Sequence, residues 1–317
     1  MATTEAREGI ALTHLDDLLF DGAGSTKRQL VDYLDRASSL ILPELRGRPL
    51  SVIRAHRGEA PFMQKNLPKY APEWLPRAEI WAEASHRQVA YALCNDRRSL
   101  MWFANQRAIE YHPALVRADD ISVMTHLVID LDPPDQSSFS AAAELARAVH
   151  EVLEGLDLRG AVKTSGSKGL HIWVPVYPLP VEHAAAATRA LAVRTAKLAP
   201  QIATTALFKS ERAGRVFVDS TRAGGATVVA AFSPRARPGV PVSFPVPWED
   251  LDRVEPAQFD LSSLDLYADQ ARTWADGMPG PQHLPTDLVE EGLGIPAPRV
   301  AAMQEGRRRA RGRQAGP

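Results

Sequence analysis

The strongest constraint on how this chain folds is an apolar strand that ends in two acids. Residues 122–131 are rich in Val, Leu and Ile, and two prolines stop the run just after Asp132. Side chains i and i+2 of a strand point to the same face. Asp130 and Asp132 therefore project together, while Ile129 and Leu131 enter the core. The segment predicts a strand whose end presents paired carboxylates.

Paired carboxylates repel each other, and without a cation the pKa of one would rise until a proton relieved the repulsion. Oxygen ligands suit Mg²⁺ and Mn²⁺, which neutralise such a pair directly. A third acid, Asp219, ends another short apolar strand. Three strand-end carboxylates can hold two metal ions about 3.5–4 Å apart, the arrangement used for in-line phosphoryl transfer. The spacing equally allows polar strand ends without a metal, with Asp132 capping the turn that follows.

A loop rich in glycine and serine lies between two predicted strands, at residues 163–171. Its glycines allow close backbone approach, and its serines and exposed N–H groups can surround a phosphate. Lys168 and His171 can add charge-assisted hydrogen bonds. It is not a Walker A loop, because the order of residues differs and no helix follows. The loop predicts a phosphate site, and the alternative is a hairpin without a ligand.

Basic residues flank Asp219 on both sides. They are Lys209, Arg212, Arg215, Arg222, Arg235 and Arg237. The planar guanidinium group of arginine matches phosphate oxygens, and few acids interrupt this series. Carboxylates, phosphate loop and arginines together predict a nucleotidyl-transfer site.

The remaining pattern is that of an α+β protein with ordinary composition. Apolar residues make up 45% of the 317, and 37 Lys and Arg balance 38 Asp and Glu, so the net charge is −1. Helices alternate irregularly with strands, and several strands are close enough in sequence to be antiparallel neighbours. We expect helices from Thr26 and over residues 98–110, 138–153 and 182–198, and strands over 50–54, 79–83, 88–94, 161–164, 170–176, 216–218 and 226–232.

We expect three regions along the chain: a flexible N-terminus at 1–10, one catalytic domain at 11–277, and an extension at 278–317. The extension is rich in Pro and Gly, then in Arg, and is expected to be disordered at its end. Its basic end is either a solubilising tail or a nonspecific phosphate-binding arm. The single cysteine, Cys94, excludes an internal disulfide and a cysteine-built metal site. Without a long apolar run or a signal peptide, the expected location is the cytoplasm.

The three motifs, in order, carry a family resemblance. Residues 130–133, 164–171 and 216–219 resemble the successive motifs of the archaeo-eukaryotic primase superfamily. More closely, they resemble the polymerase domain of bacterial DNA ligase D and its stand-alone primase-polymerase relatives. Counterparts also occur in residues 12–27, 46–50, 61–66, 109–112 and 233–239, so the resemblance runs from about residue 10 to 270. It implies a primase-type catalytic core, with a mixed or antiparallel sheet flanked by helices.

The resemblance also implies roles for individual residues. Asp130, Asp132 and Asp219 would hold two Mn²⁺ or Mg²⁺ ions that bridge the primer end and the incoming triphosphate. The nucleotide-binding positions would be Ser165, Ser167, Lys168, Gly169, His171, His112, Arg222, Arg235 and Arg237. The DNA-binding positions would be Lys27, Arg54, Phe62, Lys65 and Arg212. Phe62 would stack on the template, a contact that tolerates any base.

Three positions depart from the family pattern. Relatives often carry two adjacent aromatic residues where this chain has Phe62 and Met63, so stacking should be weaker. Ile53 replaces a lysine that many relatives have before the arginine. Members that act in end joining hold a downstream 5′-phosphate with two lysines. Lys27 matches one, but Asp17 occupies the position of the other, which places 5′-phosphate recognition in question.

The sequence therefore predicts a template-directed nucleotidyltransferase that extends primers or fills short gaps in DNA. The resemblance implies a preference for ribonucleotides, a role in DNA repair at the nucleoid, and Ku and a separate DNA ligase as candidate partners. We expect a monomeric, stand-alone polymerase unit with no membrane association. The alternatives are a primase that starts chains de novo, a non-catalytic module that binds DNA ends or gaps, and a metal-dependent phosphohydrolase.

Overall fold

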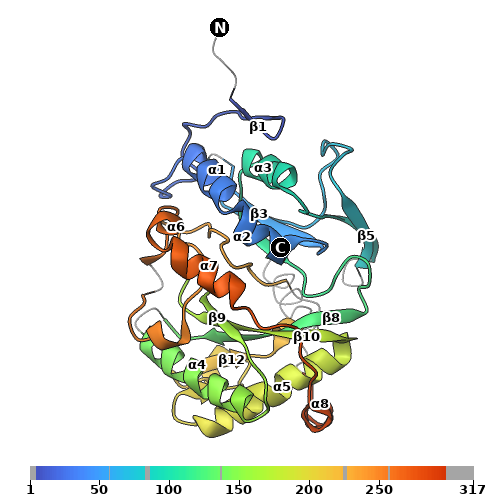
Figure 1. Ribbon diagram of the computed structural model, residues 1–317, viewed down its shortest axis with the longest axis vertical. Coiled ribbons are helices and arrows are strands. Elements are labelled where there is room, and N and C mark those ends of the chain that lie inside the picture. Colours follow the sequence, from blue (N-terminus) through green and yellow to red (C-terminus); the bar gives the residue numbers. More distant parts are fainter. Residues whose placement is uncertain are drawn as a thin grey trace, which may run out of the picture.

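Two β-sheets organise the protein, one in each half of the molecule (Figure 1). This computed structural model describes residues 5–56, 58–82, 86–135, 138–223, 227–255 and 258–297. One sheet has the order β4-β3-β6-β5, with β7 added beside β3, and the other has the order β11-β12-β8-β10-β9. Helices flank both sheets (Figure 1). The predicted α+β class, with a mixed or antiparallel sheet flanked by helices, is confirmed.

The second sheet carries the predicted motifs. Its strands are β8 (Val123–Asp132), β9 (Ala161–Thr164), β10 (Leu170–Pro180), β11 (Ala203–Thr204) and β12 (Val216–Asp219). The central strand β8 runs antiparallel to β10 and β12. In this register Asp130 pairs with His171 of β10 on one side and with Asp219 of β12 on the other. Strand pairing alone therefore brings two of the three predicted carboxylates together.

Helices α4 (Phe139–Glu154) and α5 (Val181–Leu198) cover one side of this sheet, and the N-terminal half of the protein lies on the other (Figure 1). Helix α4 buries Leu145, Val149 and Leu153, which recur at helical spacing. The buried face of α5 consists mainly of alanines. The helix α8 (Thr286–Gly294) then packs against α5.

The N-terminal half combines the other sheet with three helices. Its elements are α1 (Lys27–Arg36), α2 (Ser38–Leu45), β3 (Leu50–Arg54), β4 (Phe62–Gln64), β5 (Arg77–Ala82), β6 (Arg87–Ala92), α3 (Arg97–Asn105) and β7 (Ala108–Pro113). Helix α1 begins at the predicted residue, where Thr26 and Gln29 form a capping box. The Tyr33 hydroxyl donates to the carbonyl of Phe232 at 2.8 Å, which joins the two halves.

Short elements complete the described part of the chain. They are β1 (Ala6–Arg7), β2 (Ile10–Ala11), α6 (Ser263–Leu266), α7 (Ala268–Asp276) and 3₁₀ turns at Lys209–Glu211, Thr221–Ala223 and Trp248–Asp250. Within the described ranges, none of the helices combines the length and apolarity needed to cross a membrane.

Two predicted elements differ in the structure. The helix expected over 98–110 ends at Asn105, because the chain turns at Arg107, whose φ is 59°, and continues as β7 beside β3. The strand expected over 226–232 is irregular from Thr227 onward, and residue 226 lies outside the described residues. It bonds to the edge of β7 through Val228 and Ala230, and Phe232 then leaves the extended region with a φ of 64°. The conformation of both segments depends on pairing with strands distant in the sequence, which the local sequence pattern does not encode.

Elements lie near both ends of the described chain. Residues 6–11 form a hairpin whose Arg7 contacts Asp32 at 2.5 Å and Asp35 at 3.2 Å. Within 278–317, residues 286–294 are helix α8, where Glu291 pairs with Arg194 at 2.7 Å. The sparse apolar residues of α8 give little local signal for a helix, and in the structure Leu288 is buried while Gly292 lies close to the backbone of Ala186. The Arg-rich end, 298–317, lies outside the described residues.

Docking of α8 depends on Gly292, where an added Cβ atom would lie 1.9 Å from the carbonyl oxygen of Ala186. Because that clash is with backbone, we expect Gly292→Ala to detach α8 and lower the thermal midpoint by several degrees, as a loss of about 2 kcal/mol implies. Gly294→Ala is the matched control, since its added Cβ meets open space. Scanning calorimetry of both variants would contradict the docking if their midpoints were equal.

Candidate active site

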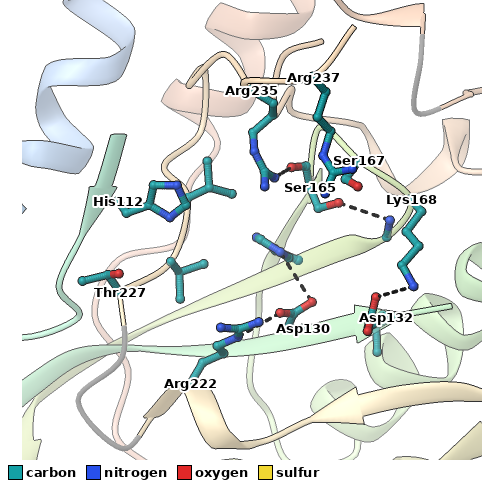
Figure 2. A pocket seen from close by; sticks show the side chains of 15 residues that line it. His112, Asp130, Asp132, Ser165, Ser167, Lys168, Arg222, Thr227, Arg235 and Arg237 are labelled. Carbon is teal, nitrogen blue, oxygen red and sulfur yellow. Dashed lines mark hydrogen bonds and ion pairs between the residues drawn. The ribbon is translucent and has the colours of Figure 1, made fainter. Parts of the chain in front are cut away.

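A cavity of about 220 Å³ opens where β8 ends and β10 begins. It collects all nine residues predicted to bind nucleotide, together with two of the three predicted carboxylates. Lining it are His112, Asp130, Asp132, Ser165, Ser167, Lys168, Gly169, His171, Arg222, Arg235 and Arg237. Figure 2 shows Arg235, Arg237 and the loop serines in the upper part of the view, and Asp130, Asp132 and Arg222 below them. Acidic and phosphate-binding groups therefore converge from separate parts of the sequence.

The carboxylates are compensated by cationic side chains. The Nε of Arg222 lies 3.1 Å from Asp130 Oδ2 and 3.4 Å from Asp219 Oδ2, so one guanidinium bridges both acids. Asp132 faces Lys168 Nζ at 3.0 Å and Arg212 Nη1 at 3.4 Å. Burial, which is the largest cause, and the charges of Asp219 and Asp132 raise the pKa of Asp130 to about 6 against the opposing charge of Arg222. Concentrated negative charge is the main electrostatic feature of this edge.

The donor set fits a hard divalent cation. All three acids offer oxygen ligands at neighbouring strand ends, and the charges of Asp219 and Asp132 both act on the buried Asp130. In the part of the chain that the structure describes, however, no three His, Cys, Asp or Glu side chains are already arranged to hold an ion. An ion bound to these oxygens would share or replace the charge compensation that Arg222 provides.

Two glycines shape the phosphate loop. At Gly169 an added Cβ atom would lie 2.1 Å from the carbonyl oxygen of Leu131, so β10 can approach β8 closely only without a side chain. At Gly166, with a φ of +65°, an added Cβ would lie 2.7 Å from Arg235 Cγ. The loop is closed by Ser165, whose Oγ accepts from the N–H of Gly169 at 3.1 Å. Both glycines therefore allow close packing of the loop against β8 and Arg235.

Sequence reasoning missed Glu110 as an organising residue. Its carboxylate, 3% exposed, contacts His112 Nε2 at 2.8 Å and Arg235 Nε at 2.9 Å, and accepts from the N–H of Ala236 at 2.9 Å. Burial alone would raise the pKa of Glu110, but the His112 hydrogen bond and the Arg235 charge outweigh it and lower the pKa to about 2. The alternation in β7 was an available signal, because Glu110 and His112 share a face.

An apolar wall of the cavity was also missed. Thr227, Val228 and Val229 line it, in the segment that the sequence predicted to be an ordinary strand. Their composition alone carries no functional signal, since valines are common in strands.

The five predicted DNA-binding residues do not form one surface. Arg212 lies at the carboxylates, with its guanidinium 3.9 Å above the Phe217 ring. Phe62 is 38% exposed on β4 and stacks on His56, with ring centroids 5.3 Å apart, and the neighbouring Lys65 is exposed. These exposed positions suit contact with a large partner.

Arg54 and Lys27 are buried instead. The guanidinium of Arg54 donates to Gln106 O at 2.8 Å, Gln64 Oε1 at 2.7 Å and Tyr70 Oη at 2.8 Å. The Lys27 ammonium, in a side chain 2% exposed, donates to Thr13 O at 2.6 Å and Asn105 Oδ1 at 2.7 Å. Burial lowers the pKa of Lys27 to about 8. Both cations serve internal contacts in this structure.

Comparison with known proteins places the chain in a family. The family model described as the LigD primase-polymerase domain matches residues 26–274. The multifunctional non-homologous end joining protein LigD of Mycolicibacterium smegmatis is 33% identical over 275 residues, which cover 84% of this chain and 36% of that protein. The bifunctional LigD of Bacillus subtilis is 27% identical over 88% of this chain and 46% of its own length.

A solved structure agrees with the sequence comparison. The polymerase domain of Mycobacterium tuberculosis ligase D, in complex with DNA, matches with a TM-score of 0.77 and 32% identity, over 85% of this chain and 99% of that one. The fold is an archaeo-eukaryotic primase-type fold, that of the LigD polymerase domain. The chain belongs to the LigD primase-polymerase domain family. It spans about a third of the length of the mycobacterial relatives that it matches.

The buried Glu110 makes a prediction for acid stability. Because its folded pKa is about 2, against an ordinary value of 4.5, its charge stabilises the fold above pH 4.5, and this contribution is lost as the pH falls from 4.5 to 2. In that range Glu110→Gln should remove up to about 1.4 kcal/mol per pH unit from the slope of unfolding free energy against pH. Urea unfolding between pH 5.5 and 3.5 measures this slope. Glu154→Gln, on the exposed side of α4, should keep the wild-type slope, and equal slopes in both variants would contradict the prediction.

Proposed function

We propose that this chain extends a primer on short-gapped or broken DNA, as a template-directed, DNA-dependent nucleotidyltransferase that uses Mn²⁺ or Mg²⁺. One observation carries the proposal. A single cavity holds strand-end carboxylates opposite a glycine loop and two arginines, which is the combination that a triphosphate and its cations require. Membership in the primase-polymerase family supports the same reaction.

Some cavity residues would position the triphosphate, and others would hold the ions that neutralise its charge. Lys168, Arg235, Arg237 and the loop N–H groups would bind the triphosphate oxygens, since guanidinium and backbone donors match them. Asp130, Asp132 and Asp219 would hold the divalent ions, which neutralise the triphosphate and favour attack by the primer 3′-hydroxyl when bound. The aspartates would also orient the cationic side chains around the nucleotide. Such catalysis consists mainly of alignment and electrostatic stabilisation.

The N-terminal sheet would contact the DNA. Phe62 and Met63, 38% and 46% exposed on β4, offer an apolar platform beside the exposed Lys65. One aromatic ring can stack on a base whatever its identity, and lysine can contact the backbone. A relative of the same fold has been solved in complex with DNA, which supports this assignment.

The repair context follows from the relatives. Several are named for non-homologous end joining, and we extend that role to this chain, acting at the nucleoid with Ku and a separate ligase as candidate partners. A preference for ribonucleotides belongs to the same proposal. The chain covers only part of those relatives, so ligation would have to come from another polypeptide or domain.

Recognition of a downstream 5′-phosphate is not part of the proposed activity. The Lys27 ammonium is occupied by Thr13 and Asn105, and Asp17 would repel a phosphate approaching nearby. The second lysine of the family pattern is absent here. We therefore expect this chain to fill gaps whether or not the downstream strand carries a 5′-phosphate.

The carboxylates give the direct test of the proposed chemistry. Asp130→Ala and Asp219→Ala should each lower extension of a labelled primer by at least about 10³-fold, because charge compensation at the reacting groups is lost. Asp269→Ala, at a position 98% exposed on α7, is the matched control and should retain full activity. Extension at wild-type rate in either carboxylate variant would refute the proposal. So would release of inorganic phosphate in place of pyrophosphate.

The far end of the gap gives a second test. Primer extension across a short gap should differ by less than about twofold between substrates with and without a downstream 5′-phosphate, because Lys27 is engaged by Thr13 and Asn105 and the second family position is Asp17. Asp17→Lys restores the family residue and serves as the comparison. A preference of about tenfold for the phosphorylated gap in the wild-type protein would show that Lys27 leaves its internal partners to bind phosphate.

A further inference from the structure

A fully buried lysine lies directly behind the cavity. Lys163, on β9, is 0% exposed, and its Nζ lies 3.0 Å from Nδ1 of His171, which lines the cavity. The same Nζ lies 2.5 Å from Ser243 Oγ and 3.5 Å from the carbonyl oxygen of Thr164. Lysine is among the residues that are almost never fully buried without a partner. The partner here is a residue of the active site.

When Lys163 is protonated, the hydrogen bonds around it have one consistent assignment. The Ser243 hydroxyl donates to Thr164 O at 2.8 Å, so its oxygen is left to accept from Lys163. An ammonium group has three donors and no acceptor. Its three neighbours are Ser243 Oγ, Thr164 O and His171 Nδ1, which use all three donors. Nδ1 of His171 is therefore an acceptor and carries no proton.

This assignment determines the other side of the imidazole ring. In a neutral histidine one nitrogen donates and the other accepts. With Nδ1 accepting, the proton lies on Nε2, which is 3.5 Å from Asp130 Oδ1 on the cavity side. His171 thus presents an Nε2–H donor to the cavity.

We propose that Lys163 is a positioning residue that holds His171 in the Nε2–H tautomer, so that His171 offers a hydrogen-bond donor to a triphosphate oxygen. The hydrogen bond from His171 to a triphosphate rests on the proposed function, whereas the tautomer of His171 does not. An Nε2 lone pair would repel the same phosphate oxygen, so the choice of tautomer decides between attraction and repulsion.

The cost of burying Lys163 argues against a purely structural role. Burial and the charge of Arg235 lower the pKa of Lys163 to about 7, although Glu44 and Asp130 attract the charge. An apolar side chain would fill the same site without that cost. An apolar residue could not donate a hydrogen bond to His171. That hydrogen bond connects Lys163 to a residue that lines the cavity.

The test combines a spectroscopic and a binding measurement. Two-bond ¹H–¹⁵N spectra of ¹⁵N-histidine-labelled protein, with His171 assigned through His171→Gln, report the tautomer directly. At pH 6, below the pKa of Lys163, the wild-type protein should show only Nε2–H, Lys163→Arg should keep it, and Lys163→Met should show a mixture. The β,γ-imido analogue of ATP should bind Lys163→Met about fivefold to tenfold more weakly.

A destabilising control separates positioning from general loosening. Leu145→Ala, in the core of α4, should change neither the His171 tautomer nor the affinity for the analogue. A wild-type Nδ1–H tautomer would overturn the inference without any variant, even if Lys163→Met fails to fold. Equal losses of affinity for the analogue in Leu145→Ala and Lys163→Met would also overturn the inference. Absence of analogue binding by the wild-type protein would instead count against the proposed function, while the tautomer result stands separately.

Discussion

Two carboxylates, Asp130 and Asp219, face each other across β8 and β12 at the buried end of a sheet, and the cationic side chains of the cavity are placed around that charge. Arg222 bridges the pair, while Lys168 and Arg212 compensate Asp132. Such a concentration of negative charge would be unfavourable in a protein interior without cations. The antiparallel register brings the two acids together, and the cationic side chains and loop N–H groups around them are the donors that the proposed triphosphate would need.

The opposite wall of the cavity depends on a second layer of buried charge. Glu110 holds His112 and Arg235, and Lys163 holds His171, so the residues that face the ligand are oriented by residues that do not. Close packing makes this possible, because Gly166 and Gly169 let the loop approach Arg235 and β8. A rigid, prearranged set of donors is what electrostatic catalysis requires, since little reorganisation is left for the reaction itself.

Much of this site could be predicted because its signals are local. Alternation along β8 placed Asp130 and Asp132 on one face, and the glycine pattern indicated close backbone approach. The parts that the sequence does not show depend on tertiary structure. The family resemblance indicated Lys27 as a DNA contact, but its burial against Asn105 is not visible in the sequence. Glu110 and Lys163 act on residues brought near by strand pairing, and β7 forms through its contact with β3, so local propensity could identify neither the roles nor the strand.

Template direction is the central claim, and it has a direct measurement. Four primer–templates that differ only in the first unpaired template base would each be incubated with the wild-type protein, Mn²⁺ and the four nucleotides supplied singly. The account predicts that the nucleotide added follows the template base in all four cases, by Watson–Crick pairing. Addition of the same nucleotide to every template, or no addition to any of them, would contradict it.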